Sequence, residues 1–232
     1  MNFRIFESVD ELTSGAADAI LDELRGDGPA VVALSGGSTP RPVYEILGSV
    51  GMDRIASRAI TWVTGDERFV PPDHPDSNAR MIQQTLFARG IPPAHQFLRF
   101  ETENGDPASV AAAFEGRWRE LGIERITLSI LGLGSDGHTA SLFPGTNALD
   151  AGGVATEVFV PRLDTWRVTL TLPVLREAAT MFVVAAGEDK RAVIERVAAG
   201  EELPISRVLQ GAGNAWWLVD RAAYPKIAEE SK

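Results

Sequence analysis

Short apolar runs alternate with longer amphipathic stretches along most of the chain. The apolar runs are rich in Val, Ile and Leu and end at Gly, Ser or Asp, which is typical of strands buried on both faces of a sheet. This pattern predicts strands at residues 3–6, 30–34, 59–63, 125–131, 167–172, 180–186 and 215–219. It predicts helices at residues 10–25, 41–48, 77–88 and 107–121.

Strands that alternate with helices predict an α/β protein with a mostly parallel sheet. Right-handed βαβ units would place helices on both faces of that sheet, as three layers. Residues 157–172 fit a β-hairpin as well as a βαβ unit, so we expect some antiparallel pairing. The length suits one domain over residues 1–232, with a small β-rich annex around residues 155–172 as its one subdivision.

Four polar segments that contain glycine or charged residues follow predicted strands. They are residues 35–40, 64–78, 132–138 and 187–190. Because parallel strands have their carboxyl ends at one edge of a sheet, ligands bind in the loops at that edge. We therefore expect these four segments to form one site from distant parts of the chain.

The segment Ser-Gly-Gly-Ser-Thr-Pro at residues 35–40 is a candidate anion site. Gly36 and Gly37 allow a ligand to approach the backbone closely, and Ser38 and Thr39 add hydroxyl groups near the start of a helix. The alternative is an ordinary strand-to-helix turn with a Ser or Thr cap. The segment has neither the Walker A pattern nor Gly-x-Gly-x-x-Gly.

Asp66, Glu67 and Arg68 stand in a row after the strand at residues 59–63. Arg68 could stabilise a developing oxyanion or hold a phosphate, and Arg80 could do likewise. The alternative is a solvated charged turn. We treat Asp66 and Glu67 as candidates for lining the pocket.

His138 lies in the glycine-rich segment Gly-Leu-Gly-Ser-Asp-Gly-His at residues 132–138. A carboxylate near an imidazole fixes its tautomer, so Asp136 and His138 suit a general base that acts on water. Gly134 and Gly137 are further pocket candidates, and the alternative is a structural histidine. We expect His95, which follows two prolines, to lie in a surface turn.

Arg167 begins a predicted strand, and Lys190 follows another at the expected start of a helix. Either side chain could be a solvated charge. Together with the loop at residues 35–40, they could instead complete a phosphate site.

Composition limits the classes of partner. The chain has 22 basic and 32 acidic residues and a net charge of −10, so it lacks the basic footprint of a nucleic-acid-binding protein. No apolar run approaches the ~20 residues of a membrane-spanning helix, and we expect no membrane partner. The first residues do not resemble an export signal, so we expect a cytoplasmic protein.

The chain has no cysteine, which excludes disulfides, thiol nucleophiles and thiolate metal sites. No two histidines have the spacing of metal ligands, and the carboxylates are scattered, so we expect no metal. There is no Gly-x-Ser-x-Gly segment to support a serine nucleophile.

The order and spacing of several motifs resemble those of 6-phosphogluconolactonase. The motifs, in chain order, are LSGGSTP, GDERFVP, LGLGSDGHTASLFPG, RVTLTLP and GEDK. The resemblance covers most of the chain. It implies the modified Rossmann-like α/β/α fold of a superfamily that also contains the glucosamine-6-phosphate deaminases.

The resemblance also implies an activity and a role for each site residue. The expected reaction is hydrolysis of 6-phospho-D-glucono-1,5-lactone in the oxidative pentose phosphate pathway, with no cofactor. His138 would activate water, Asp136 would orient His138, and Arg68 would stabilise the oxyanion. The 6-phosphate would bind the following residues: Gly36, Gly37, Ser38, Thr39, Arg167 and Lys190.

Two alternatives are less well supported by the sequence. A deaminase pattern has a glutamate where this chain has Phe143, and a tyrosine is usual in place of Arg68. A non-catalytic sugar-phosphate sensor would need a partner-reading segment, and none is visible. One departure from the lactonase pattern is the segment Pro-Arg-Leu-Asp-Thr-Trp at residues 161–166, where a proline-rich run is usual. The sequence is compatible with a monomer or a weak homo-oligomer.

Overall fold

A seven-stranded parallel sheet forms the centre of the part of the chain that the computed structural model describes, residues 1–226. All of its neighbouring strands pair in parallel. Their spatial order is β1 (Asn2–Phe6), β10 (Ala215–Asp220), β9 (Thr180–Ala185), β6 (Leu128–Leu131), β2 (Ala30–Leu34), β3 (Ile60–Thr64) and β5 (His95–Leu98).

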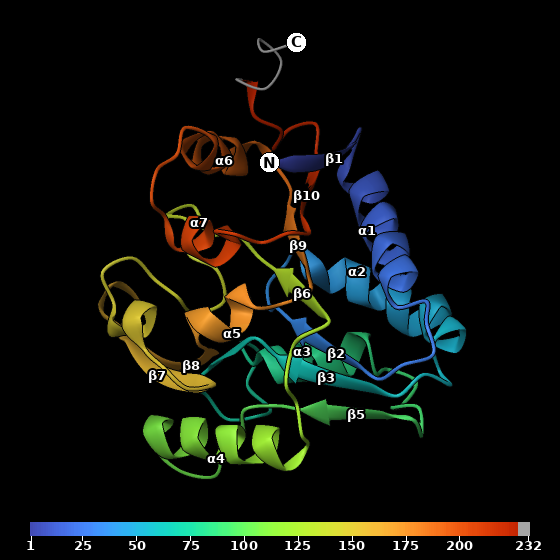
Figure 1. Ribbon diagram of the computed structural model, residues 1–232, viewed down its shortest axis with the longest axis vertical. Helices are drawn as coiled ribbons and strands as arrows, with labels where there is room; N and C mark the ends of the chain where they lie inside the picture. Colours follow the sequence, from blue (N-terminus) through green and yellow to red (C-terminus); the bar gives the residue numbers. More distant parts are fainter. Residues whose placement is uncertain (227–232) are drawn as a thin grey trace.

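Helices cover both faces of this sheet (Figure 1). One face packs against α1 (Val9–Glu23), α2 (Pro40–Ile46) and α3 (Asn78–Thr85). The other packs against α4 (Pro107–Glu120), α5 (Leu172–Arg176), α6 (Arg191–Ala198) and α7 (Pro204–Leu209). The expected three-layer α/β/α fold is therefore confirmed.

The two apolar cores follow from the alternation of side chains along each strand. Val32 and Leu34 point into the core under α1, while Ala33 between them points into the other core. Phe182 and its neighbour Val183 divide in the same way. A strand that buries both faces must be apolar at successive positions, which is the pattern that marked these strands in the sequence.

Polar caps set the beginnings of the longer helices. Ser8 accepts a hydrogen bond from the Glu11 amide at 3.2 Å, and Asp106 accepts one from the Ser109 amide at 2.8 Å. These side chains satisfy backbone donors that have no partner inside the helix. Ser77 begins α3 in the same way.

A second, three-stranded sheet lies beside the first and is antiparallel. It contains β4 (Asp66–Arg68), β8 (Thr165–Leu170) and β7 (Ala155–Val160), with β8 in the middle. The expected hairpin at residues 157–172 is confirmed as β7 and β8. Strand β4 was not expected, because three charged residues carry no strand pattern; pairing with β8 forms it.

His95 is buried, contrary to the expected surface turn. It is the first residue of β5, where its Nδ1 lies 3.2 Å from Nε1 of buried Trp62 and its Nε2 lies 3.0 Å from the Ile55 carbonyl. Burial lowers the pKa of His95, so the ring is neutral. The prolines before His95 correctly indicated a turn, but β5 begins directly after that turn, with His95 as its first residue.

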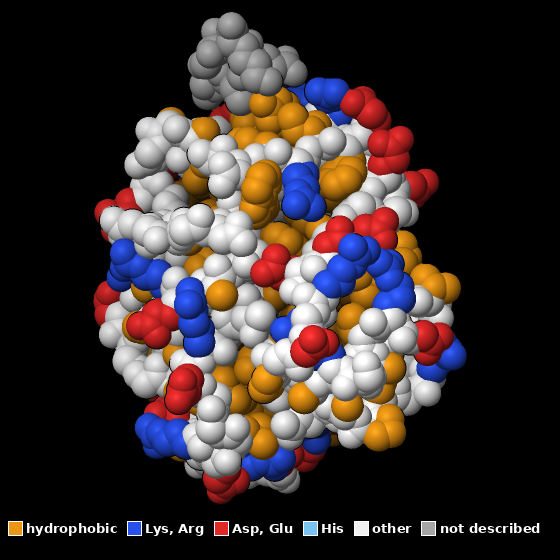
Figure 2. Space-filling view, turned by 45° about the vertical axis from the view of Figure 1, so that its right-hand side comes forward, with side chains coloured by type: hydrophobic (Ala, Val, Ile, Leu, Met, Phe, Trp, Pro, Cys, Tyr) orange, Lys and Arg blue, Asp and Glu red, His pale blue; other side chains and the backbone are white. Residues whose placement is uncertain are grey.

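Acidic and basic side chains are interspersed on the face shown in Figure 2. No helix within residues 1–226 combines the length and the hydropathy that a bilayer crossing requires.

Candidate active site

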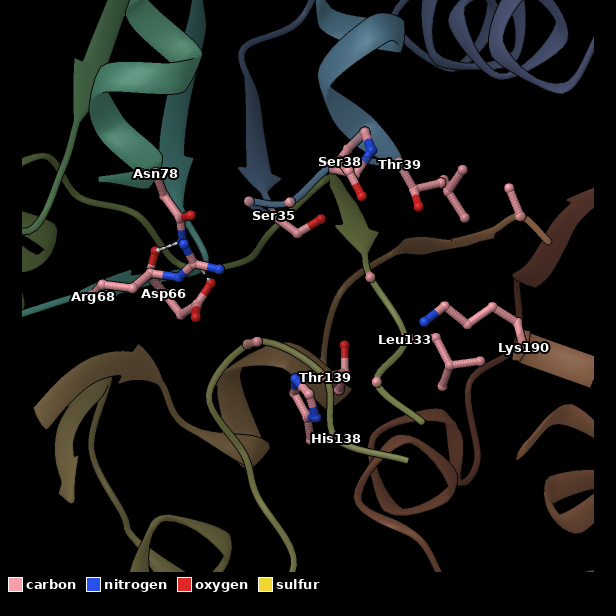
Figure 3. A pocket seen from close by; sticks show the side chains of 18 of the residues that line it. Ser35, Ser38, Thr39, Asp66, Arg68, Asn78, Leu133, His138, Thr139 and Lys190 are labelled. Carbon is pink, nitrogen blue, oxygen red and sulfur yellow. Dashed lines mark hydrogen bonds between the residues drawn. The ribbon is translucent and has the colours of Figure 1, made fainter. Parts of the chain in front are cut away.

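A cavity of about 370 Å³ lies at the carboxyl ends of the central strands (Figure 3). Segments that follow β2, β3, β6 and β9 contribute to its walls, as the sequence predicted. The candidate residues that line it are Gly36, Gly37, Ser38, Thr39, Asp66, Arg68, Gly134, His138, Arg167 and Lys190. Its size suits a small molecule, and its lining is largely polar.

Gly134 is the position where the loop at residues 132–138 leaves room for the imidazole. A Cβ atom on Gly134 would lie 2.0 Å from His138 Nδ1, closer than any side chain allows. The Gly134 amide donates to the His138 carbonyl at 2.8 Å, which folds the loop back on itself. The His138 ring therefore lies against the backbone of Gly134, and a larger residue there would displace it.

Asp136 holds His138 by its inner nitrogen. Oδ1 of Asp136 lies 2.5 Å from Nδ1 of His138 and 3.2 Å from the His138 amide. Burial opposes the charge of Asp136, but the hydrogen bond from His138 keeps the carboxyl pKa below its usual value. An ionised carboxylate only accepts, so the proton of the neutral ring is on Nδ1 and Nε2 is free to act as a base.

Two opposing effects act on the pKa of His138. Burial is the larger and lowers the pKa, while the hydrogen bond that His138 donates to Asp136 raises it. The result lies below the ordinary histidine value, so the imidazole is neutral at neutral pH. Phe143 stacks on the ring, with centroids 4.1 Å apart and an interplanar angle of 26°, and contributes to its burial.

Asp66 is a buried carboxylate in the cavity wall. It accepts from Ser141 Oγ at 2.6 Å and from Asn78 Nδ2 at 3.1 Å, and Arg167 Nη1 lies 3.8 Å away. These partners fix the carboxylate in one orientation. Asp66 can therefore accept a hydrogen bond from a ligand hydroxyl without moving.

Asn78 lines the cavity and was missed in the sequence. Besides its bond to the Asp66 side chain, it donates to the Asp66 carbonyl at 2.9 Å. A Cβ on Gly36 would lie 1.8 Å from Asn78 Oδ1, so this contact explains why the segment at residues 35–40 needs glycine there. An asparagine at a helix start resembles a capping residue, and its role is visible only in three dimensions.

Glu67 does not line the cavity, and the expectation that it would is corrected. Its buried carboxylate accepts from the amides of Arg68, Asn78 and Ala79 at 2.9, 2.7 and 2.7 Å. It also accepts from Ser77 Oγ at 3.1 Å. Burial raises the pKa of Glu67, and these backbone donors oppose the rise. Glu67 thus ties β4 to the start of α3.

Gly137 also lies outside the cavity lining, as does the side chain of Asp136. The Gly137 carbonyl accepts from the Ile205 amide at 3.0 Å, which attaches the loop at residues 132–138 to α7. Asp136 contacts His138 from outside the cavity, so any effect on a ligand passes through the imidazole.

Three cationic side chains line the cavity: Arg68, Arg167 and Lys190. Figure 3 shows Arg68 and Lys190 on opposite sides, with His138 between them in the view. Arg68 Nη1 donates to the Asp76 carbonyl at 2.8 Å, and Lys190 Nζ lies 3.0 Å from Asp189 Oδ2. Although the net charge of the chain is −10, the cavity lining holds these three cations against two carboxylates, those of Asp66 and Asp189, and this excess favours an anionic ligand.

Two buried hydroxyls of the cavity wall have no hydrogen-bond partner within the described part of the chain. They are Ser35 Oγ and Thr139 Oγ1, and both point toward the open space in Figure 3. A buried polar atom without a partner is costly, so these hydroxyls are suited to a polar ligand. Neighbouring Ala140 has a φ of 48°, an unusual conformation for a residue with a side chain.

Among residues 1–226, no cluster of three or more His, Cys, Asp or Glu side chains is arranged to hold a metal ion. The chemistry available in the cavity is that of an imidazole base, two arginines, a lysine and fixed hydroxyl and carboxylate groups.

Comparison with known proteins identifies the family. The family model described as "Glucosamine-6-phosphate isomerases/6-phosphogluconolactonase" matches residues 6–217. The chain belongs to this family. The 6-phosphogluconolactonase of a Nostoc species is 35% identical over 94% of each chain, and that of Rattus norvegicus is 34% identical over 94% of this chain and 91% of its own.

Solved structures of the family have the same fold. The 6-phosphogluconolactonase of Trypanosoma brucei superposes with a TM-score of 0.83 at 28% identity, covering 100% of this chain and 98% of its own. A monomeric glucosamine-6-phosphate deaminase superposes with a TM-score of 0.81 at 20% identity, covering 96% and 98%, and shows the fold alone. The resemblance noted in the sequence is thus confirmed, and the residues around His138 decide between the two activities.

Proposed function

We infer that the protein is a 6-phosphogluconolactonase that hydrolyses 6-phospho-D-glucono-1,5-lactone to 6-phospho-D-gluconate in the pentose phosphate pathway. The observation that carries this inference is the pair of Asp136 and His138 with Phe143 stacked on the imidazole. The pair supplies a neutral base, and the phenyl ring stands where a deaminase pattern has a proton-carrying glutamate. Lactone hydrolysis needs one base and no such glutamate.

The reaction begins at Nε2 of His138. The imidazole takes a proton from water, and the hydroxide adds to C1 of the lactone. Arg68 stabilises the tetrahedral oxyanion, because a preorganised cation acts where negative charge develops. The intermediate then breaks the bond between C1 and the ring oxygen, and the imidazolium returns its proton to that oxygen. One water is consumed, and the free base is restored.

The 6-phosphate binds at a distance from C1 in this proposal. The hydroxyls of Ser38 and Thr39 and the ammonium of Lys190 hold it, with the backbone of Gly36 and Gly37. Arg167 completes the positive charge of the cavity. Binding a group that does not react can position the carbonyl beside His138, which lowers the barrier without a cofactor.

The test compares wild type and His138→Ala on freshly prepared 6-phosphoglucono-δ-lactone, with EDTA present and the uncatalysed rate subtracted. We expect fast opening by the wild type and a loss of about 10²–10⁴-fold in the variant, the usual contribution of a general base. Glucono-δ-lactone without phosphate should be a poor substrate. Equal rates for the two proteins would mean that His138 is structural.

A second assay separates the lactonase from the deaminase alternative. We expect no ammonia release from glucosamine 6-phosphate, because Phe143 cannot move a proton. Release at a rate comparable to lactone opening would contradict the assignment.

We propose further that the enzyme acts in the cytoplasm as a monomer or weak homo-oligomer, on a phosphosugar lactone and with no nucleic-acid or membrane partner. Light scattering across a concentration series checks the oligomeric state.

A further inference from the structure

The short turn between β7 and β8 (Pro161–Leu163) brings Arg162 to the catalytic pair. Arg162 Nη2 lies 2.7 Å from Oδ2 of Asp136, while Oδ1 of the same carboxylate holds His138 Nδ1 at 2.5 Å. One carboxylate therefore joins a guanidinium on one side to the imidazole on the other. Both of its oxygens are occupied, so it cannot rotate without losing a partner.

Arg162 reaches the imidazole by a second route. Its guanidinium carbon lies 5.1 Å from the centroid of the Phe143 ring, within the range of a cation–π contact. Phe143 in turn stacks on His138. Contacts thus connect four residues in a closed cycle, which we call the four-residue cluster: Arg162, Asp136, His138 and Phe143.

We propose that Arg162 is a positioning residue for His138. Arg162 holds Asp136 from outside the cavity and completes the four-residue cluster. This inference rests on the proposed function, in which His138 is the base. Arg162 comes from the segment that departs from the lactonase pattern, so the sequence carried no sign of this role. A contact through both the edge and the face of the imidazole restricts the ring to one orientation, with Nε2 directed at the cavity.

The charges around His138 predict how removal of Arg162 acts. Asp136 from the same loop and Asp66 from β4 face the imidazole as anions, and Arg162 faces it as a cation. The guanidinium carbon of Arg167 from β8 lies 5.4 Å from the centroid of the Phe143 ring, and Arg196 from α6 acts on Asp136. Burial is the main cause of the low pKa of His138, and Arg162 lowers it further. Without Arg162, the negative charges of Asp136 and Asp66 are opposed by less positive charge near the imidazole, so we expect the pKa of His138 to rise.

The experiment compares wild type with Arg162→Gln and Arg162→Lys. The matched control is Arg54→Gln, because Arg54 is 45% exposed and pairs with one aspartate, while Arg162 is 51% exposed. Two quantities are measured: the pH profile of kcat/KM for lactone opening, and the titration of the His138 ring by NMR. The His138 signal is assigned by its loss in His138→Ala.

We expect Arg162→Gln to lose about two- to fivefold in kcat/KM at neutral pH, the range that a half-exposed ion pair supports. In this variant, the acidic limb of the kcat/KM profile and the NMR titration midpoint of His138 should both move to higher pH. Arg162→Lys retains the charge and should restore the limb, and Arg54→Gln should match wild type.

Two results would overturn the proposal. One is a pH profile and a titration in Arg162→Gln that coincide with wild type. The other is a uniform loss of rate in both Arg162 variants with an unmoved limb, which is the sign of a purely structural role. If the wild type does not open the lactone, the proposed function fails, but the NMR titration still decides whether Arg162 acts on His138.

Discussion

The imidazole of His138 meets a carboxylate at one edge and an aromatic ring on one face. The carboxylate favours the protonated ring, whereas burial favours the neutral ring and is the stronger influence. A base that is neutral at neutral pH, with its proton on Nδ1, needs both neighbours. The sequence indicated Asp136 and His138 because they stand two positions apart among glycines. It indicated Phe143 only as the residue that replaces the glutamate of a deaminase pattern, and not as the stacking partner of His138.

The pH dependence of lactone opening follows from this environment. A base works only when it is unprotonated, so kcat/KM should fall as the pH decreases through the pKa of His138. Since that pKa is lowered from 6.5, the fall should be centred below pH 6.5. Initial rates corrected for uncatalysed hydrolysis test this prediction. A limb centred above pH 6.5 would show that another group or a charged histidine controls the rate.

At the scale of elements, β4 and α3 depend on one buried carboxylate. Glu67 accepts hydrogen bonds from three backbone amides and one hydroxyl. These bonds join β4, which carries Asp66 and Arg68, to α3, which carries Asn78. In the sequence, Glu67 stood in a charged row and was a candidate for the pocket. Only the path of the chain shows that it faces inward, away from the cavity.

Substitution of Glu67 should therefore lower stability more than a surface change of the same kind. In Glu67→Gln, an NH₂ group replaces one of the carboxylate oxygens that accept hydrogen bonds from backbone amides. A backbone donor would then lose its acceptor. We expect a loss of about 1–3 kcal/mol in the free energy of unfolding, typical of buried donors left without a partner. Denaturant titration measures it, with Glu124→Gln at an exposed position as the control. Equal stability of the two variants would contradict the structural role.

At the scale of the whole molecule, the two sheets share one apolar core. Val158, Val168 and Leu170 of the three-stranded sheet belong to the same cluster as Val183 and Trp217 of the central sheet. The β-rich segment is joined to the main body by buried contacts, and no boundary of polar linker separates them. We therefore propose that the chain folds as a single domain.

A single domain should unfold in one cooperative step. We expect the denaturant midpoints from far-UV circular dichroism and from tryptophan fluorescence to coincide, because Trp62 and Trp217 lie in the two separate cores and report on both. Two distinct midpoints would indicate that the β-rich segment, or one face of the sheet, unfolds independently.

Local sequence patterns are enough to predict the layers of the fold and most of the candidate site. Apolar runs mark strands buried on both faces, and polar segments after such strands meet at one edge, so the cavity and its cations could be predicted from local patterns. Contacts between elements determine which polar side chains are buried and which face the cavity. His95 is buried because Trp62 and the Ile55 carbonyl satisfy its ring, and Glu67 because the start of α3 supplies its donors. Asn78 faces the cavity because Gly36 leaves room for it, and Arg162 reaches Asp136 through the pairing of β7 and β8. Such contacts join separate elements of the fold, and no local pattern of polarity encodes them.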